Sequence, residues 1–599
     1  MTRRLLFMLK SYLMLILFFV SQKVVFMLVN VGHADGAPFG SCVAALWHGL
    51  RLDTAMACYI LVMPLIVLVV SSFFVKINLR AVLRPWWWLS AVLIAVVFVA
   101  DTVLYLFWGA KIDANDLIYA AKPKDMLASV KWWSIVAGIV VIAATVWIYG
   151  RCLCRITPTS VHRHNRWLSL IYIPLAGLLF LGVRGGVSES TANPSYAYFS
   201  KHQFCNHAAL NPFFNMVHSL FKTEDLLHEF DFLSGDEAVS KVAPLFATGD
   251  DVTDTLLRCR RPDILMIVWE GGGKAMVMND SVGENLMRYC DEGVVFTNLY
   301  SNNFRTDRGL VSLLSGWQGL PTTSLMKMND KCRKLPSLAR ELANVGYNTS
   351  FVYGGDIDFT NMRGYMLETG FEKAVGSEAF PESRRLSGWG APDAYTLLPS
   401  LMGGESPSFD VFLTLSSHEP WTVPIRRLRD DRKNSFAYTD SCIGVMIDSL
   451  RHSPRWDSLL IIIVPDHGVA LSSSQSTSDP AVAPIPMVWI GGAVNGHHEV
   501  DVMMNQSDLA ATLLAQMGLS HKSFPLSRNV LSAEYADNYR FALHCFKNGC
   551  NLFDNEGITR FDCASRSATD ISGTSGEDRS QFVKTLLQAI YNITGHLGE

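Results

Sequence analysis

The sequence is poor in charged residues. Only 18% of its 599 residues are Asp, Glu, Lys or Arg, against roughly 25% in soluble domains, which argues against a purely soluble protein. A net charge of −3 gives none of the basic excess that nucleic-acid binding requires, so no nucleic-acid partner is expected. Twelve cysteines are too few for a disulfide scaffold. A hydrophobic content of 49% together with the low net charge excludes a disordered chain.

The apolar residues are concentrated before residue 185. Spanning the hydrocarbon core takes about 20 apolar residues in a helix, with about 17 as the lower bound. The sequence predicts five such helices, which are residues 5–28, 54–75, 85–110, 132–150 and 167–183. The first is weakened by Lys10 and Lys23, and the last by its length. We therefore assign residues 1–184 to a transmembrane domain of five helices.

The charges of the connecting loops predict the orientation of this domain. With the N-terminus in the cytoplasm, the inner segments carry nine basic residues and the outer loops five, as the positive-inside rule requires. Five crossings then place everything after residue 184 outside the cytoplasm, in a multi-pass protein of the cell (inner) membrane. A cleaved signal peptide at residues 5–28 is disfavoured by length and by the lack of a cleavage site. Asp101, inside the third span, is interpreted as bonding to a neighbouring helix.

The remainder of the chain reads as a linker and an enzyme domain. Residues 185–255 are expected to form a linker with short helices, and residues 256–599 a catalytic domain. Short continuous apolar runs at 264–269, 411–415 and 459–464 indicate strands covered on both faces. Helical periodicity appears at 336–345, 440–450 and 507–517. This pattern predicts an α/β domain with a mainly parallel sheet.

Three of these strands run directly into polar side chains. The first ends at Glu270, the second leads to Ser-Ser-His418-Glu-Pro-Trp, and the third to Pro-Asp466-His467-Gly. Ligands of open α/β sheets bind beyond the carboxyl ends of the strands. Carboxylates and imidazoles gathered there suit a divalent ion such as Mn²⁺, Zn²⁺ or Mg²⁺. The sequence therefore predicts a metal site at this edge of the sheet.

A threonine opens a helix within the segment Asn-Phe-Arg-Thr306-Asp-Arg-Gly-Leu. Thr306 stands where a helix N-cap is expected. The same position favours a nucleophile, because helix N-terminal amides attract phosphate and a nearby cation lowers the pKa of a hydroxyl. Position alone leaves the two roles open.

These motifs, in this order behind apolar helices, resemble the lipoteichoic acid synthase family, which consists of phosphoglycerol transferases of the alkaline phosphatase/sulfatase superfamily. The resemblance implies that Glu270, Thr306, Asp466 and His467 bind one divalent metal ion, commonly manganese, with magnesium or zinc possible. It implies that Thr306 is the nucleophile and that His418 contacts the phosphate or protonates the leaving group. The residues that would contact the substrate head group are Tyr353, Asn361, Arg363 and Trp421.

The segment 353–363 departs from the family pattern. Tyr353 stands in place of a histidine, Thr360 in place of a tryptophan, and Met362 in place of an arginine, with Arg363 one position later. The resemblance therefore implies the class of reaction without fixing the head group.

The expected activity is transfer of a phosphoglycerol-type head group through a phospho-threonine. The donor would be a phospholipid of the outer leaflet and the acceptor a glycan or growing polymer. The alternatives are a phosphoethanolamine transferase, a phosphodiesterase or sulfatase-type hydrolase, and a catalytically inactive sensor. Sulfate-ester hydrolysis is disfavoured because the sequence has no Cys/Ser-x-Pro-x-Arg motif. Cys545, Cys550 and Cys563 lie close enough in sequence for one disulfide, whose pairing the sequence leaves open.

Overall fold

The structure is a computed structural model of the whole chain. It describes all residues except 1, 35, 74–76, 109–110, 113–131, 160–165, 189, 201, 221–225, 280, 387–389, 403–404, 472–474, 538, 564, 574–576 and 599. The chain divides into two compact units, Met1–Thr223 and Glu224–Glu599. The division falls inside the segment 185–255 that the sequence suggests as a linker. Each unit is described by itself.

The first unit is helical. Its α-helices are α1 (Thr2–Val29), α2 (Phe39–His48), α3 (Leu50–Val70), α4 (Leu79–Trp108), α7 (Trp132–Ile156), α8 (Tyr172–Arg184), α9 (Gln203–Ala209) and α10 (Pro212–Leu220). Among the described residues, four stretches are long and apolar enough to cross a membrane: Thr2–Val29, Phe39–Val70, Leu79–Leu106 and Val136–Ile156. The predicted count of five is not confirmed. The fifth stretch is the shorter apolar helix Ser169–Arg184, which at 1.5 Å per residue reaches about 24 Å across a core of about 30 Å.

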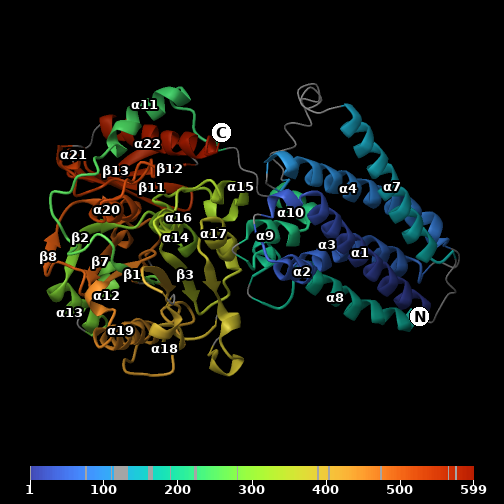
Figure 1. Cartoon of the computed structure of the whole chain (residues 1–599), viewed down its shortest axis with the longest axis horizontal. Coiled ribbons are helices and arrows are strands. Elements are labelled where there is room, and N and C mark those ends of the chain that lie inside the picture. The colour runs from blue at the N-terminus through green and yellow to red at the C-terminus, as the bar shows by residue number, and fades with distance from the viewer. Residues whose placement is uncertain are drawn as a thin grey trace. The chain divides into compact units, whose positions relative to one another are not determined.

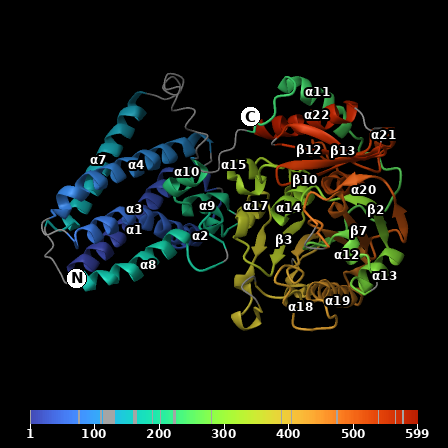
Figure 2. The ribbon, with the colours of Figure 1, turned by 180° about the vertical axis from the view of Figure 1, so that it is seen from behind.

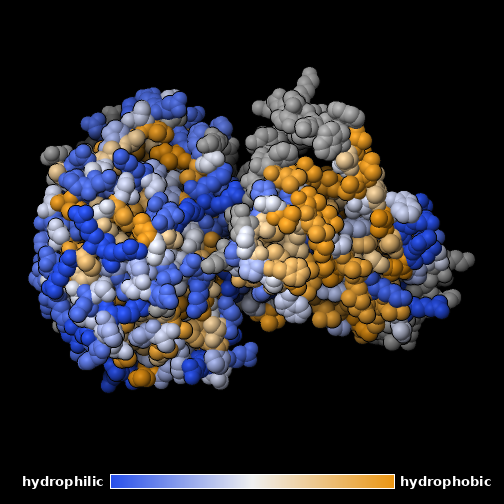
Figure 3. Space-filling view, in the orientation of Figure 1, coloured by the Kyte–Doolittle hydropathy of each residue, from blue (hydrophilic) through white to orange (hydrophobic). Residues whose placement is uncertain are grey.

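The outer surface of these helices is apolar, whereas charged groups are buried within the unit. Aliphatic side chains such as Leu17 of α1 and Leu93 of α4 are exposed, and Figure 3 shows an extended apolar surface over this unit. Such a surface, together with the four long apolar helices, indicates a membrane anchor. Inside the unit, Lys23 pairs with Asp53 at 2.7 Å.

Two predictions concern the partner of Asp101 and the orientation of the first unit in the membrane. Asp101 pairs with Lys111 at 2.5 Å, a residue of the segment that follows α4, so its partner is not on a neighbouring helix as expected. Several of the loop charges that predict the orientation, including the acidic and basic residues of 113–131 and the basic residue within 160–165, lie outside the described residues. The orientation stays a prediction.

The second unit is built on a nine-stranded sheet with the order β4-β3-β5-β1-β6-β7-β2-β8, and β9 also pairs with β2. Strands β4, β3, β5, β1 and β6 are parallel to one another, and β7 is antiparallel to both β6 and β2. The strands are β1 (Asp263–Trp269), β2 (Val294–Tyr300), β3 (Asn348–Tyr353), β4 (Lys373–Val375), β5 (Ser408–Leu413), β6 (Leu459–Pro465), β7 (Pro484–Ile490), β8 (His498–Val500) and β9 (Met504–Asn505). The predicted α/β domain with a mainly parallel sheet is confirmed.

Helices cover both faces of this sheet (Figure 1). Along β1, Ile264, Met266 and Val268 enter one core and Leu265, Ile267 and Trp269 the other, which explains why the strand is apolar at every position. The first core receives α14 (Thr306–Ser315), α16 (Leu338–Asn344), α17 (Met362–Glu368) and α20 (Leu509–Gln516). The second receives α12 (Lys274–Val277), α13 (Glu284–Glu292) and α19 (Asp431–Arg451), with α18 (Asp393–Thr396) beside α19.

A second, antiparallel sheet lies near the C-terminal helix, as Figure 2 shows from behind. Its strands are β10 (Phe541–Phe546), β11 (Gly549–Asp554), β12 (Gly557–Asp562) and β13 (Ser567–Gly573), in this order. Helix α22 (Glu577–Gly595) packs on β12 and β13, and α11 (Gly235–Phe246) packs on α22. The remaining helices are α15 (Asn329–Cys332) and α21 (Ala533–Asp537).

Candidate metal and nucleophile site

Two adjacent parallel strands deliver the first ligands. In the register of β1 and β6, Trp269 pairs with Pro465, so that Glu270 and Asp466, each the next residue, leave the sheet side by side. The ligand atoms of Glu270, Asp466 and His467 all lie within 4.8 Å of one another, and all three residues are buried. The structure therefore brings together three of the four residues proposed to bind metal, and Thr306 completes the set, as shown below.

Asp466 has one satisfied oxygen and one unsatisfied oxygen. Its Oδ1 accepts hydrogen bonds from the backbone amides of Gly271 and His467, each at 2.8 Å. Its Oδ2 is buried without a hydrogen-bond partner. A buried, unpaired carboxylate oxygen is costly unless a ligand or proton satisfies it. The backbone bonds thus orient the carboxylate and aim Oδ2 at the site.

The orientation of His467 selects its metal-binding nitrogen. Nδ1 lies 2.9 Å from the carbonyl oxygen of Gly468, and since a carbonyl only accepts, Nδ1 carries a proton. Nε2 lies 3.5 Å from Glu270 Oε1 and 3.6 Å from Asp466 Oδ2. A histidine held by its other nitrogen in this way is the arrangement that metal-ligating imidazoles adopt.

The pKa values of these three groups are set by burial and by the charges of their neighbours. Burial opposes ionisation of Glu270, but the hydrogen bond and charge of His467 lower its pKa to about 2. Burial and the charge of Glu270 raise the pKa of Asp466 to about 7. Burial disfavours the imidazolium of His467, but the Asp466 and Glu270 carboxylates raise its pKa to about 10. The two carboxylates therefore favour a positive charge between them.

These residues fit a divalent ion. The unpartnered Asp466 Oδ2, a Glu270 oxygen and the His467 Nε2 offer two hard oxygens and one nitrogen within one small volume. This donor set suits Mn²⁺, Zn²⁺ or Mg²⁺.

Thr306 lies beside this cluster. Its hydroxyl donates a hydrogen bond of 3.0 Å to Glu270 Oε2. Of the two roles left open for Thr306, the N-cap position of α14 belongs to Arg305, and Thr306 is the first residue of the helix. The close packing depends on Gly309, where an added Cβ would lie 2.1 Å from the carbonyl oxygen of Asp466.

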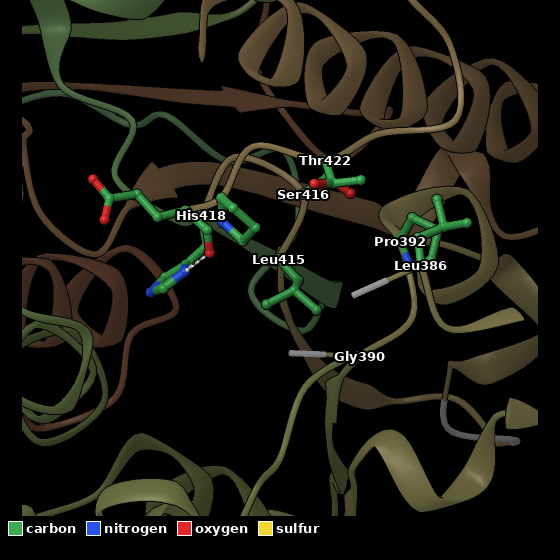
Figure 4. A pocket seen from close by; sticks show the side chains of 9 residues that line it. Leu386, Gly390, Pro392, Leu415, Ser416, His418 and Thr422 are labelled. Atoms are coloured by element: carbon green, nitrogen blue, oxygen red, sulfur yellow. Dashed lines mark hydrogen bonds between the residues drawn. The ribbon is translucent and has the colours of Figure 1, made fainter. Parts of the chain in front are cut away.

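His418 approaches from the end of β5. Its Nδ1 lies 2.7 Å from the carbonyl oxygen of Glu419, drawn as the dashed line in Figure 4, and therefore carries a proton. The charge of His418 contributes to lowering the pKa of Glu270, which places the imidazole near the cluster. The same loop holds the Glu270 backbone, since Thr414 Oγ1 accepts its amide at 2.9 Å and Ser417 Oγ donates to its carbonyl at 2.7 Å.

Of the four predicted substrate contacts, Tyr353 lies near the cluster. It ends β3, and burial, followed by the charges of Glu270 and Asp466, raises its pKa well above the usual value. The Trp421 ring is half-buried, with the Arg432 guanidinium 5.5 Å from its centroid.

The other two predicted contacts are engaged in bonds to other residues of the second unit. Asn361 Nδ2 donates to the carbonyl oxygen of Met326 at 2.7 Å and to Asn329 Oδ1 at 2.6 Å. The Arg363 guanidinium pairs with Asp358 and Glu378, each at 2.8 Å. The structure thus gives Asn361 and Arg363 bonds that order the segment 353–363. Their contact with a substrate stays a prediction.

Two residues that support the site were not predicted from the sequence. Gln506 Nε2 donates to the carbonyl oxygens of Pro465 and Asp466 at 2.7 and 2.8 Å, and so fixes the turn after β6. Asp393 accepts the backbone amides of Leu415 and Ser416 at 2.7 and 3.2 Å, and so fixes the turn before His418. Gln506 follows the two-residue strand β9 and Asp393 opens the four-residue helix α18, and elements this short leave no pattern that distinguishes these residues from surface polar residues.

Comparison with known proteins agrees with the fold of the second unit. Residues 262–519 match the sequence model of the Sulfatase family. A protein of the alkaline phosphatase superfamily from Vibrio parahaemolyticus has a similar structure, with 20% identity and a TM-score of 0.53 over 61% of this chain and 98% of that one. So does the lipoteichoic acid synthase LtaP from Listeria monocytogenes, with 16% identity and a TM-score of 0.50 over 59% and 97%. At these identities the two structures show the shared fold.

Proposed function

We propose that this chain, whose residues 262–519 form a domain of the alkaline phosphatase/sulfatase superfamily, is a membrane-anchored transferase. It would move a phosphate-linked head group from a phospholipid to a hydroxyl acceptor through a covalent intermediate on Thr306. The observation that carries the proposal is the Thr306 hydroxyl, at the start of α14, donating 3.0 Å to Glu270 beside Asp466 and His467.

The first half of the reaction follows from these contacts. Thr306 Oγ1 loses its proton towards Glu270 Oε2 and attacks phosphorus, forming the Oγ–P bond while the bond from phosphorus to the diacylglycerol oxygen breaks. His418, whose Nδ1 is held as a donor to Glu419, gives a proton from Nε2 to the departing oxygen. The amides at the N-terminus of α14 favour the anionic phosphoryl group.

The second half returns the enzyme to its starting state. An acceptor hydroxyl attacks phosphorus, its proton passes to His418 Nε2, and the bond to Thr306 Oγ1 breaks. Thr306 then recovers its proton from Glu270. Diacylglycerol leaves in the first half and the head-group conjugate in the second, so atoms and protons balance.

Glu270, Thr306, Asp466 and His467 would hold the metal ion. When bound, a divalent ion lowers the pKa of a hydroxyl and stabilises developing negative charge. We propose manganese from the resemblance to lipoteichoic acid synthases, with magnesium and zinc as alternatives that the same donor atoms accept.

The helical unit supports a lipid donor. Four helices apolar enough to span a bilayer would keep the enzyme in the cell membrane. A fifth crossing by the helix Ser169–Arg184 would place the second unit outside the cytoplasm, facing the outer leaflet. The structural similarity to the lipoteichoic acid synthase LtaP, together with the resemblance of the motifs to that family, favours a phosphoglycerol head group and a glycan or polymer acceptor. Because segment 353–363 departs from the family pattern, phosphoethanolamine is the alternative head group.

Trapping the intermediate tests the proposal. Full-length protein in lipid nanodiscs receives manganese and phosphatidylglycerol or phosphatidylethanolamine, followed by rapid acid quench and peptide mass spectrometry. We expect diacylglycerol release and a head-group phosphate adduct on the peptide containing Thr306. Thr306→Ala should fold, form no adduct and lose turnover by at least about 100-fold.

Thr297→Ala is the matched control. Thr297 is a half-buried threonine of β2 whose hydroxyl also donates to a carboxylate, Asp501, at 2.8 Å, so its loss should leave adduct and turnover unchanged. Turnover by Thr306→Ala near the wild-type rate would refute the nucleophile. An adduct that is released only to water, whatever hydroxyl acceptor is supplied, would identify a phosphodiesterase instead.

A further inference from the structure

The second unit has a surface cavity beside α18 and α19 that the proposed reaction does not use. Its volume is about 240 Å³. An apolar cavity of about 150 Å³ is large enough to hold benzene, so this one accommodates a length of hydrocarbon chain. Figures 1 and 2 both show α18 and α19 side by side, and residues of both helices line the cavity.

Helix α19 contributes an apolar stripe to the cavity wall. Ala437, Tyr438, Ser441, Cys442 and Val445 line it, and their spacing of three and four residues places them on one helix face. The residues of α19 that pack in the sheet core, such as Phe436, Ile443 and Ile447, occupy a neighbouring face. Tyr438 and Cys442 also belong to that core, so Ala437, Ser441 and Val445 are the residues of the stripe that the core does not include.

Exposed aliphatic side chains mark the edge of the cavity. Val445 is 72% exposed, Ile425 51% and Leu398 36%, and all three line it. Clustered exposed apolar side chains on a folded domain indicate a site for a ligand, a membrane or a partner.

The chain beside the cavity is basic. Residues 426–433 contain five basic and two acidic side chains, and Arg427 itself lines the cavity. Arg426 pairs with Asp431 at 2.9 Å, which leaves an excess of positive charge along this segment. An apolar cavity with a basic margin complements an anionic lipid, whose hydrocarbon enters the cavity while its phosphate stays at the surface.

The cavity and the surroundings of His418 are built from the same two chain segments. A smaller hollow beside this residue is lined by Pro392, Ser416 and Thr422, among others (Figure 4). The large cavity begins at Ala394 and Ile425, two and three residues further along the same two segments. Asp393 joins them, since it accepts the amides of Leu415 and Ser416 and the hydroxyl of Thr439 on α19.

We propose that this cavity holds an acyl chain of an anionic phospholipid. Its role as a donor site rests on the proposed function, in which a phospholipid reaches Thr306. The segments 391–398 and 415–427 would then hold the head group near His418, while the acyl chain stays beside α19.

Two substitutions alter the cavity without changing a catalytic residue. Ala437→Trp fills it from α19. Val445→Glu places a negative charge at its edge, and because Val445 is mostly exposed, the fold does not depend on it. Ser449→Trp is the matched control, since Ser449 is an exposed residue of α19 that does not line the cavity.

Photo-crosslinking tests occupancy without turnover. Full-length Thr306→Ala in nanodiscs is irradiated with phosphatidylglycerol that carries a diazirine on its acyl chain, and trypsin then releases residues 434–451 by cutting after Lys433 and Arg451. We expect labelling of this peptide to fall at least five-fold with Ala437→Trp or Val445→Glu and to persist with Ser449→Trp. A phosphatidylcholine probe should label it several-fold less, and Arg427→Gln should reduce that preference.

Kinetics on the enzyme with an intact Thr306 tests the role of the cavity. We expect Ala437→Trp to lower kcat/KM at least ten-fold for a dioleoyl donor and to leave a dihexanoyl donor with the same head group unchanged. If lipid turns over but Ala437→Trp and Val445→Glu match Ser449→Trp in both labelling and kcat/KM, the cavity proposal is wrong and the proposed function stands. If the cavity is labelled as expected but no lipid turns over, binding by the cavity stands and the proposed function is wrong. Equal labelling by both lipids would overturn the anionic specificity.

Discussion

Thr306 donates a hydrogen bond to Glu270 across 36 positions of sequence, at 3.0 Å. Thr306 is the first residue of a helix, and Glu270 directly follows a strand. The carbonyl oxygen of Asp466 lies so close to α14 that only glycine fits at position 309. A helix dipole, a hydroxyl and a carboxylate are thereby held in one place before any substrate arrives.

Glu270→Gln tests this relationship. The amide keeps the size of the side chain but removes the negative charge and the capacity to take the Thr306 proton. We expect the loss of turnover to reach at least about 10²–10⁴-fold, as for removal of a general base, with a folded protein. Retention of more than a tenth of the wild-type rate, measured by diacylglycerol release, would contradict the role of Glu270.

Asp466→Asn tests the metal site. Asparagine can still accept the amides of Gly271 and His467 through its oxygen, but it places an NH₂ donor where Oδ2 faces the site. Removing a residue that hydrogen-bonds to a metal ligand lowers metal affinity about 10–100-fold. Removing the ligand itself should therefore lower the affinity at least about 100-fold. Metal content of the purified full-length variant, measured by elemental analysis after dialysis, provides the readout.

Asp440→Asn is the control for that substitution. Asp440 is also buried and accepts two backbone amides, from Asn285 and Leu286 at 2.9 and 3.0 Å, but it lies outside the cluster of Glu270, Asp466 and His467. It should retain full metal content. Equal metal in both variants would show that Asp466 is not a ligand.

The strand ends were predictable from the sequence because burial on both faces leaves a distinctive signal. Every residue of β1 and β6 is buried, so the apolar run itself locates the polar residue that follows it. That reasoning found Glu270 and Asp466. It could not find Gln506, because the bonds that hold the turn after β6 connect residues 40 and 41 positions apart.

The roles of single residues in irregular segments were harder to predict. Arg363 is paired with Glu378, 15 positions away, through a chain path that no periodicity describes. The hydroxyl of Thr306 could have capped its own helix, and only the approach of α14 to Glu270 and Asp466 shows that it donates to Glu270 instead. The fifth apolar segment was predicted to cross the membrane mainly from its composition, whereas the ability of a helix to cross also depends on its length.

Reporter fusions test whether the helix Ser169–Arg184 crosses the membrane. Four crossings would return the second unit to the side of the N-terminus, and five place it on the opposite side. From the basic residues of the inner segments we expect five, with bilayer thinning or flanking residues making up the missing length. Alkaline phosphatase fused after residue 158 should be inactive, and fused after residue 250 active. Equal activity at both positions would mean that this helix does not cross.

The register of the antiparallel sheet predicts which of its cysteines can form a disulfide. Cys545 of β10 lies directly opposite Cys550 of β11, and both are fully buried. Opposed residues of antiparallel strands have Cα atoms about 4.5–5.5 Å apart, within the range of about 4.4–6.8 Å that a disulfide spans. Cys563 lies on the chain beyond β12 and has no such partner in the register of the described strands.

We therefore expect a Cys545–Cys550 disulfide if the second unit matures in an oxidising compartment, with Cys563 left as a thiol. Closing so short a loop should stabilise the unit by about 2 kcal/mol. Blocking free thiols during lysis, followed by non-reducing peptide mapping, should recover Cys545 and Cys550 as one crosslinked pair. Cys563→Ser should preserve the pair and Cys545→Ser should abolish it. Recovery of a Cys550–Cys563 bridge would show that the register does not govern pairing, and full labelling of all three thiols would show that this hairpin stays reduced where the protein works.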